Sequence, residues 1–254
     1  MCLAVFGWQV HADFPLVLVA NRDELHARPT APLNWWGTPP LLGGRDLEAG
    51  GTWLAVDARG RFGLVTNLRG APAPTGAPSR GTLIPQFLTS NASPSDFLES
   101  LAAEAHRYAG FNLLLGDPRE LACLSNADRS GPRRLEPGIH GLSNGPLHSN
   151  WPKVRRGRER LAEAIASPAA ESLIAVLEER TPAKDAELPD TGVGVELERL
   201  LSAPFIVAPH YGTRSTTSLL LAADGSGVAI ERSFAADGLA RTTRRIDLPP
   251  NRRA

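Results

Sequence analysis

The sequence is poor in the residues that build cross-linked or metal-bound domains. Its 254 residues include two cysteines, Cys2 and Cys123, which are too few for a disulfide framework and form no C-x-x-C pair for zinc. No histidines have metal-ligand spacing, and the H-E-x-x-H, G-x-G-x-x-G and Walker sequences are absent. We therefore expect no metal and no resident cofactor. A reducing, cytoplasmic location is the natural interpretation of the cysteine usage.

Long apolar runs and an excess of one charge are also missing. No apolar stretch approaches the roughly 18–20 residues of a membrane span. The first twenty residues lack the basic start of a signal peptide, and His11, Asp13 and Pro15 interrupt them. Lys and Arg together number 27, as do Asp and Glu, so the totals provide no basic footprint for nucleic acid. We expect neither a nucleic-acid partner nor integral membrane association, and the pattern sets no oligomeric state.

What is present is a globular composition with short apolar runs. Residues 2–10 and 15–20 are joined by a short polar link, which predicts a hairpin because parallel strands need a long crossover. A second hairpin is predicted for residues 53–57 and 62–66. Between the two hairpins, residues 28–51 are rich in Pro and Gly and predict a long ordered loop that carries Trp35 and Trp36. Strands are predicted again at residues 112–115 and 120–124, and from 216 to 248.

Helical patterns fall in two blocks between these strands. Ser93 is a predicted N-cap, followed by Pro94 and by an acid at Asp96. Further helices are predicted for residues 154–166 and 169–179. The order of strands, helices, strands, helices and strands, with hairpins dominating, predicts an α+β fold of antiparallel sheets covered by helices. A single domain over residues 1–254 is the simplest organisation.

Cys2 is the first candidate catalytic residue because of its position. Removal of Met1 is favoured when the next residue is small, and it would leave a thiol and a free α-amine on one residue. The amine titrates near about 7.7–8.0 and the thiol near about 8.5, so the amine can act as the base for its own side chain. The alternative is a small apolar strand residue, since free cysteines are commonly buried.

A charged tetrad, Asn21-Arg22-Asp23-Glu24, ends the second predicted strand. In a hairpin of this length, the tetrad lies beside Cys2 as its cross-strand neighbour. A guanidinium there favours the thiolate over the thiol. A carboxylate there can hold the arginine or accept a hydrogen bond from the α-amine. The alternative is a solvated charged turn.

With these features and five further motifs, the sequence resembles the NRDE family, which is the family of transport and Golgi organisation protein 2. The matching motifs run in order from residue 1 to about 217: Met1-Cys2, Asn21–Glu24 with Arg28-Pro29, Gly50–Leu54, Thr66-Asn67, Ser79–Gly81, Gly141–Asn144 and Tyr211–Arg214. The resemblance implies an N-terminal nucleophile hydrolase fold, an αββα sandwich of two antiparallel sheets between helical layers. It implies hydrolysis of a non-peptide-chain amide bond in a small acylated substrate, and it links the family to haem trafficking and to lipid or acyl-CoA homeostasis.

The resemblance also implies residue roles, by analogy with the penicillin V and bile-salt acylases. Carried across by motif, the nucleophile is Cys2, the early charged pair is Arg22 and Asp23, the oxyanion donor is Asn144, the late arginine is Arg214, and Asn67 is a second polar donor. Those acylases space the Arg and the Asp three residues apart, whereas here they are adjacent. Neighbours on an extended chain face opposite sides. One of the pair is therefore expected to face Cys2, with Asn21 or Glu24 supplying the other contact.

Two alternatives stay open at this level. Gly141–Gly145 fits the G-x-S-x-G elbow of α/β-hydrolases, and Asp190 and His210 follow Ser143 in the required order, but prolines delay the next helix. The second is a binding or trafficking protein that uses the same pocket for haem or an acylated ligand without catalysis. Trp35 and Trp36 would then line an apolar pocket, and haem would be a ligand held through a residue such as His210.

Overall fold

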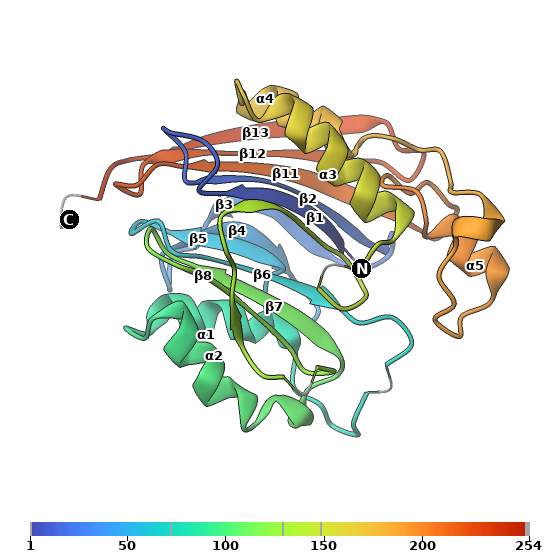
Figure 1. Ribbon diagram of the computed structural model, residues 1–254, viewed down its shortest axis with the longest axis horizontal. Helices are drawn as coiled ribbons and strands as arrows, with labels where there is room; N and C mark the ends of the chain where they lie inside the picture. Colours follow the sequence, from blue (N-terminus) through green and yellow to red (C-terminus); the bar gives the residue numbers. More distant parts are fainter. Residues whose placement is uncertain (1, 72, 129, 148, 252–254) are drawn as a thin grey trace.

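Two antiparallel sheets lie face to face, and helices cover the outer face of each (Figure 1). The computed structural model describes residues 2–71, 73–128, 130–147 and 149–251, with Cys2 described through its backbone alone. The first sheet contains, in spatial order, β10 (Gly138–Leu142), β1 (Cys2–Trp8), β2 (Leu16–Leu25), β11 (Tyr211–Leu221), β12 (Gly227–Phe234) and β13 (Ala240–Leu248). The second contains β3 (Thr30–Trp35), β4 (Leu41–Asp46), β5 (Leu54–Asp57), β6 (Phe62–Asn67), β7 (Phe111–Gly116), β8 (Leu121–Ser125) and β9 (Arg133–Arg134). The predicted α+β sandwich is confirmed.

The α-helices are α1 (Leu83–Thr89), α2 (Pro94–Ala102), α3 (Pro152–Ala164), α4 (Ala170–Leu173) and α5 (Val195–Leu200), and the short 3-10 segments are η1 (Arg80–Thr82), η2 (Ala105–Arg107), η3 (Ile174–Leu177) and η4 (Asp185–Glu187). In Figure 1, α1 and α2 cover the second sheet, α3 and α4 cover the first, and α5 lies beyond the end of the sheets. The predicted cap of α2 is confirmed, because the Ser93 hydroxyl accepts a hydrogen bond from the Asp96 N–H at 3.1 Å. None of the described helices is both long and apolar enough to span a membrane.

Alternating side chains of β1 and β2 build two different cores. Ala4 and Phe6 point between the sheets, where they pack in one cluster with Leu64 of β6. Leu3 and Val5 point the other way and pack beneath α3 and α4. All five side chains are buried, and burying a large apolar side chain stabilises the fold by about 1.5–3 kcal/mol. The strand that begins at the candidate nucleophile is thus held on both faces.

The long loop predicted for residues 28–51 is wrong, because this segment forms the hairpin of β3 and β4. The proline of β3, Pro32, is tolerated because β3 is an edge strand with a register irregularity beside that residue. The glycines of β4 are required by close packing. A Cβ on Gly44 would lie 2.3 Å from the Trp53 ring, and one on Gly43 would lie 2.7 Å from the Leu54 carbonyl oxygen. Composition suggested a loop here, whereas packing against the neighbouring strand demanded small residues.

Candidate active site

The register between β1 and β2 places Cys2 directly opposite Arg22. The predicted hairpin and the predicted adjacency of Cys2 to the charged tetrad are therefore confirmed for the backbone. The tetrad lies inside β2 and does not end it, since β11 pairs along the other side of β2 as far as Leu25. The solvated-turn alternative is wrong, because Arg22 and Asp23 are 3% and 0% exposed. The Cys2 side chain and Met1 lie outside the described residues, so the removal of Met1 and the orientation of the thiol stay predictions.

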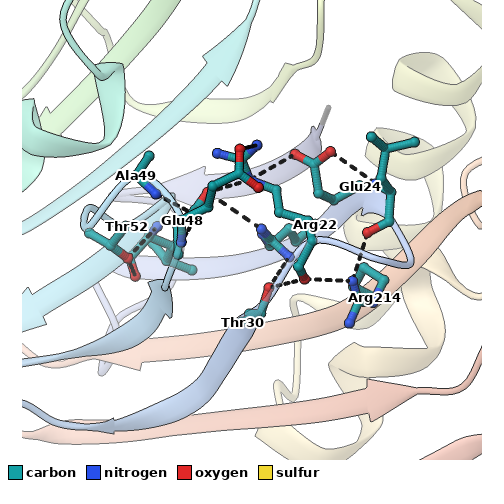
Figure 2. A network of polar contacts seen from close by, with 11 residues as sticks. Arg22, Glu24, Thr30, Glu48, Ala49, Thr52 and Arg214 are labelled. Atoms are coloured by element: carbon teal, nitrogen blue, oxygen red, sulfur yellow. Dashed lines mark hydrogen bonds and ion pairs between the residues drawn. The ribbon is translucent and has the colours of Figure 1, made fainter.

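Arg22 lines a cavity of about 540 Å³ between the sheets. Its Nη1 donates a hydrogen bond to Thr30 Oγ1 at 2.9 Å, and Nη2 lies 3.8 Å from Asp46 Oδ2 (Figure 2). The guanidinium also stacks over the Trp53 ring, 4.3 Å from its centroid. Nη2 itself has no hydrogen-bond partner among the described residues. A buried guanidinium N–H that lines a cavity is a ready donor for an incoming oxygen or sulfur anion.

Acidic side chains surround the mouth of this cavity. Arg28 donates to Asp46 at 2.7 Å and to Glu48 at 3.0 Å, and it lies 4.0 Å from Glu24. Burial works against the ionised form of Asp46, but the hydrogen bond and charge of Arg28, together with the hydrogen bonds from the backbone N–H groups of Ala49 and Glu48, lower the pKa of this carboxyl. Glu24 accepts a hydrogen bond from the Leu25 N–H at 2.9 Å. These contacts hold charged groups of both signs in place beside the cavity.

Asp23 belongs to the other face of β2, toward the helical layer. Its Oδ1 accepts a hydrogen bond from Thr213 Oγ1 at 2.7 Å, and Thr213 in turn accepts from the Ile206 N–H at 2.9 Å. Burial raises the pKa of Asp23, and the positive charge of Lys153 opposes this rise. The adjacent pair has different partners: Arg22 contacts Thr30 and Trp53, whereas the Asp23 carboxyl bonds to Thr213. Both residues are among those that line the cavity. Which of the two faces Cys2 stays a prediction, because the Cys2 side chain lies outside the described residues.

Asn21 shares the helical face with Asp23. Its Nδ2 donates to the carbonyl oxygens of Leu177 at 3.1 Å and Pro204 at 2.9 Å, and its Oδ1 accepts from Thr216 at 2.6 Å. All its described hydrogen bonds fasten β2 to β11 and to the helical layer. The structure does not bring this side chain to the wall of the cavity.

Arg214 is the extra residue of a β-bulge. Thr213 pairs with Asp23 and Ser215 with Arg22, so Arg214 has no partner position on β2. Its Nη1 donates to the carbonyl oxygens of Leu25 at 2.8 Å and Arg28 at 3.3 Å, which braces the turn between β2 and β3 (Figure 2). Burial and the nearby charge of Arg22 lower the pKa of Arg214. The late arginine thus lies close enough to Arg22 for their charges to act on each other, but it is not among the residues that line the cavity, and its role stays a prediction.

The two candidate oxyanion donors are in contact with each other. Asn144 is buried, and its Nδ2 donates to the backbone carbonyl of Asn67 at 2.9 Å. Asn67 lines the cavity that contains Arg22, whereas Asn144 is not part of that lining. The described geometry therefore gives Asn67 direct access to the cavity and places Asn144 behind it.

Trp35 and Trp36 do not line the Arg22 cavity. The Trp36 indole N–H donates to the Gly43 carbonyl at 3.0 Å, and its ring stacks under Arg45. Trp36 lines a separate groove of about 400 Å³ with Pro39 and Pro85. Trp35 ends β3 and is 36% exposed. The aromatic side chain at the candidate site is instead Trp53.

Sequence reasoning missed two buried charged residues near the site. Glu231 Oε1 accepts a hydrogen bond from the Leu33 N–H at 2.7 Å; burial raises the pKa of Glu231, while the positive charge of Arg22 opposes the rise. Lys153 is buried in the first turn of α3. A signal existed for Lys153, because it precedes the buried Gly157 and Leu161 at four-residue spacing, so the helical period places it on the buried face.

The α/β-hydrolase alternative is excluded by the architecture. Ser143 follows β10 directly, but the next helix, α3, begins only at Pro152, and both sheets are antiparallel. The Ser143 carbonyl accepts hydrogen bonds from Thr66 at 2.6 Å and Asn112 at 3.2 Å, which tie this segment to the second sheet. In the described ranges, no cluster of three or more His, Cys, Asp or Glu side chains could hold a metal ion.

The arrangement of the two sheets and their helices is similar to that of known structures. It is similar to a solved structure described as a Caenorhabditis elegans N-acylethanolamine-hydrolyzing acid amidase ortholog, with a TM-score of 0.51 and 10% identity over 86% of this chain and 92% of that chain. The chain has the N-terminal nucleophile hydrolase fold.

The sequence comparisons define the family. A family model described as Transport and Golgi organisation 2 matches residues 1–236. A Bos taurus Transport and Golgi organization protein 2 homolog is 34% identical over 92% of this chain and 93% of its own length. The Drosophila melanogaster Transport and Golgi organization protein 2 is 28% identical over 87% of each. The chain belongs to the Transport and Golgi organisation 2 family, and the resemblance inferred from its motifs is confirmed.

Proposed function

We propose that this protein is a cysteine N-terminal nucleophile amidohydrolase that acts on the amide bond of a small acylated substrate. The observation that carries the proposal is the pairing of Cys2 with Arg22 in a fold of this class, with Arg22 lining a cavity of about 540 Å³. We expect the Cys2 thiol to lie on the side toward the second sheet, because every second residue of β1 points to that side, as Ala4 and Phe6 do. The nucleophile would therefore open toward the cavity.

The chemistry follows from a thiol and an amine on one residue. After removal of Met1, the α-amine takes the thiol proton as Sγ attacks the amide carbonyl, and Arg22 stabilises the thiolate. An amide donor, Asn67 with Asn144 behind it, stabilises the oxyanion. The C–N bond breaks, the leaving amine takes the proton from the α-ammonium, and water then hydrolyses the acyl-thioester to release the carboxylic acid.

Intact-mass spectrometry tests this proposal directly. The purified protein should have lost Met1 and should gain one acyl group on Cys2 when treated with an activated amide or a β-lactone. Cys2→Ala is the matched control and should gain nothing. The second thiol is an internal reference, since burial raises the pKa of Cys123 to about 12 and leaves it unreactive at neutral pH. Retained Met1, or an adduct on Cys123 alone, would contradict the proposal.

A second candidate function is binding of haem or an acylated ligand in the same cavity without turnover, in a cytoplasmic trafficking role. The observation that favours it is Arg22 Nη2, which has no hydrogen-bond partner among the described residues and can receive a ligand carboxylate. Titration with haemin distinguishes the two functions. Binding alone predicts a saturable Soret shift that survives Cys2→Ala and is lost in Arg22→Met. No saturable shift would remove haem from consideration.

A further inference from the structure

Lysine is rare in this chain, and one of the two lysines lies in the interior. Only Lys153 and Lys184 occur among the 254 residues. Lys153 is 1% exposed in the first turn of α3, whereas Lys184 lies on the exposed segment before η4. A buried ammonium is costly unless an opposite charge and hydrogen bonds compensate it. The position of the nearest buried anion therefore decides what Lys153 can do.

The packing of α3 places Lys153 at the beginning of β1. A Cβ on Gly157 would lie 2.9 Å from Val5 Cγ1, and a Cβ on Gly7 would lie 2.2 Å from Ile165 Cδ1. Later residues of the helix thus lie over later residues of the strand. Lys153 comes one turn before Gly157 on the same helix face, about 6 Å back along the axis, which corresponds to about two strand residues. That position is at the start of β1.

A buried acid at this end of the strand is Asp23. Because Cys2 pairs with Arg22, the next residue of β2 lies at the start of β1. Its carboxyl is 0% exposed and bonds toward the helical layer through Thr213. Burial raises the pKa of Asp23, and the charge of Lys153 is the strongest influence that opposes the rise. Thr213 and the amino terminus of the chain act in the same direction as Lys153, whereas Glu24 acts against it.

We propose that Lys153 is a positioning residue that keeps Asp23 ionised beside the start of β1, so that Asp23 can accept a hydrogen bond from the α-amine of Cys2. This inference rests on the proposed function, because it takes the amine of the processed chain as the base. Lys153 stays protonated and Asp23 stays ionised throughout. The amine alone exchanges the thiol proton, and the carboxylate holds the amine in the orientation that this transfer needs.

The first test measures the alkylation of Cys2 by iodoacetamide between pH 5 and pH 9, followed by intact mass in a Cys123→Ser background. Lys153→Met removes the charge, and Lys153→Arg keeps it. Without the ammonium, Asp23 protonates at higher pH, so the acid limb of the rate profile should move to higher pH, and at a given pH on that limb the rate should fall several-fold. Lys153→Arg should keep the wild-type profile. A wild-type profile in Lys153→Met would overturn the proposal.

The second test is a double-mutant cycle measured by urea unfolding. It remains informative if Lys153→Met folds poorly, because it measures that loss of stability directly. Adding Asp23→Asn removes the carboxylate that Lys153→Met leaves uncompensated. The double variant should therefore be more stable than Lys153→Met alone, while its Cys2 stays slow. A double variant no more stable than the single one would show that Asp23 is not the group Lys153 compensates. If the wild-type protein keeps Met1, or if its Cys2 is not acylated, the proposed function fails. The stability cycle then still tests separately whether Lys153 compensates the charge of Asp23.

Discussion

Arg22 and Asp23 are neighbours in sequence, yet they lie in two different surroundings. Arg22 faces the space between the sheets, where a cavity, a tryptophan ring and Asp46 surround it. Asp23 faces the helical layer, where it is completely buried and bonds to Thr213. The pKa shifts differ accordingly, since Asp46 on the cavity side titrates below its usual value and Asp23 above it. Both residues line the cavity, but Arg22 keeps a donor there that has no hydrogen-bond partner among the described residues, whereas the Asp23 carboxyl is fully buried and bonded to β11.

The largest expected effect concerns a buried ion pair, whose charges depend on each other as those of Arg22 and Asp23 depend on their partners. Arg69 and Glu198 form an ion pair whose side chains are both about 3% exposed, and Arg69 stacks on Trp151 beside the start of α3. Glu198→Ala leaves a buried guanidinium without its carboxylate, so we expect a loss of about 3–5 kcal/mol in the free energy of unfolding. Urea unfolding measures this loss.

The same short helix provides a matched control for that measurement. Glu196 is 86% exposed and pairs with Arg199 on the surface of α5. Exposed ion pairs contribute little, so Glu196→Ala should leave the urea midpoint almost unchanged. Equal urea midpoints for Glu198→Ala and Glu196→Ala would contradict the expected difference between a buried and an exposed ion pair.

A smaller effect, on reactivity and not on stability, is expected on the cavity side. Arg22→Met removes the charge opposite Cys2 and keeps an apolar chain against Trp53, so the thiolate should be less favoured and alkylation at pH 7 should slow about tenfold. Arg45→Met is the control, because Arg45 is exposed and stacks on Trp36, away from the cavity lining. Both rates are measured by quenching the alkylation reaction at several times in a Cys123→Ser background and determining the alkylated fraction by intact-mass spectrometry. Similar slowing in the two variants would point to a general charge effect in place of the proposed pairing.

The smallest effect is the pH dependence of stability, which should have opposite signs on the two faces. The lowered pKa of Asp46 means that its contribution is present above the usual 3.8 and is lost as the pH falls through the folded-state value. The raised pKa of Asp23 means that its contribution is complete below 3.8 and is lost as the pH rises through the folded-state value. From about pH 6 to pH 3, the stability advantage of wild type over Asp46→Asn should therefore shrink, and that over Asp23→Asn should grow. Parallel slopes in urea titrations would remove the contrast.

Much of this site could be predicted from local patterns, and the misses have physical causes. The hairpin that sets Cys2 against the tetrad follows from two apolar runs and a short link, because hairpin geometry fixes register over short distances. The strands β3 and β4 were missed because Pro32, Gly43 and Gly44 suggest a loop. Their reason is tertiary: an edge position for the proline, and close contact with Trp53 and Leu54 for the glycines.

Long-range contacts decided which side chains share the cavity. Trp35 and Trp36 were expected in the ligand pocket, but the β3–β4 hairpin carries Trp36 to a separate groove and leaves Trp53 against Arg22. Glu231 is about 200 residues from Arg22 in sequence, and only the pairing of β12 with β11 brings it into the same core. No period in the local sequence contains that information.

The amino-acid sequence by itself determined the antiparallel architecture, the family and the register of the first hairpin, because each depends on interactions between residues close along the chain or on ordered motifs. The tertiary structure alone decided that Arg22 would lie against Trp53 and Asp46, that Asp23 would be buried against Thr213, and that the charge of a lysine on α3 would act on this buried acid. The physical reason is that burial and charge compensation depend on elements packed from opposite ends of the chain, and these act on a side chain only after the sheets and helices have come together.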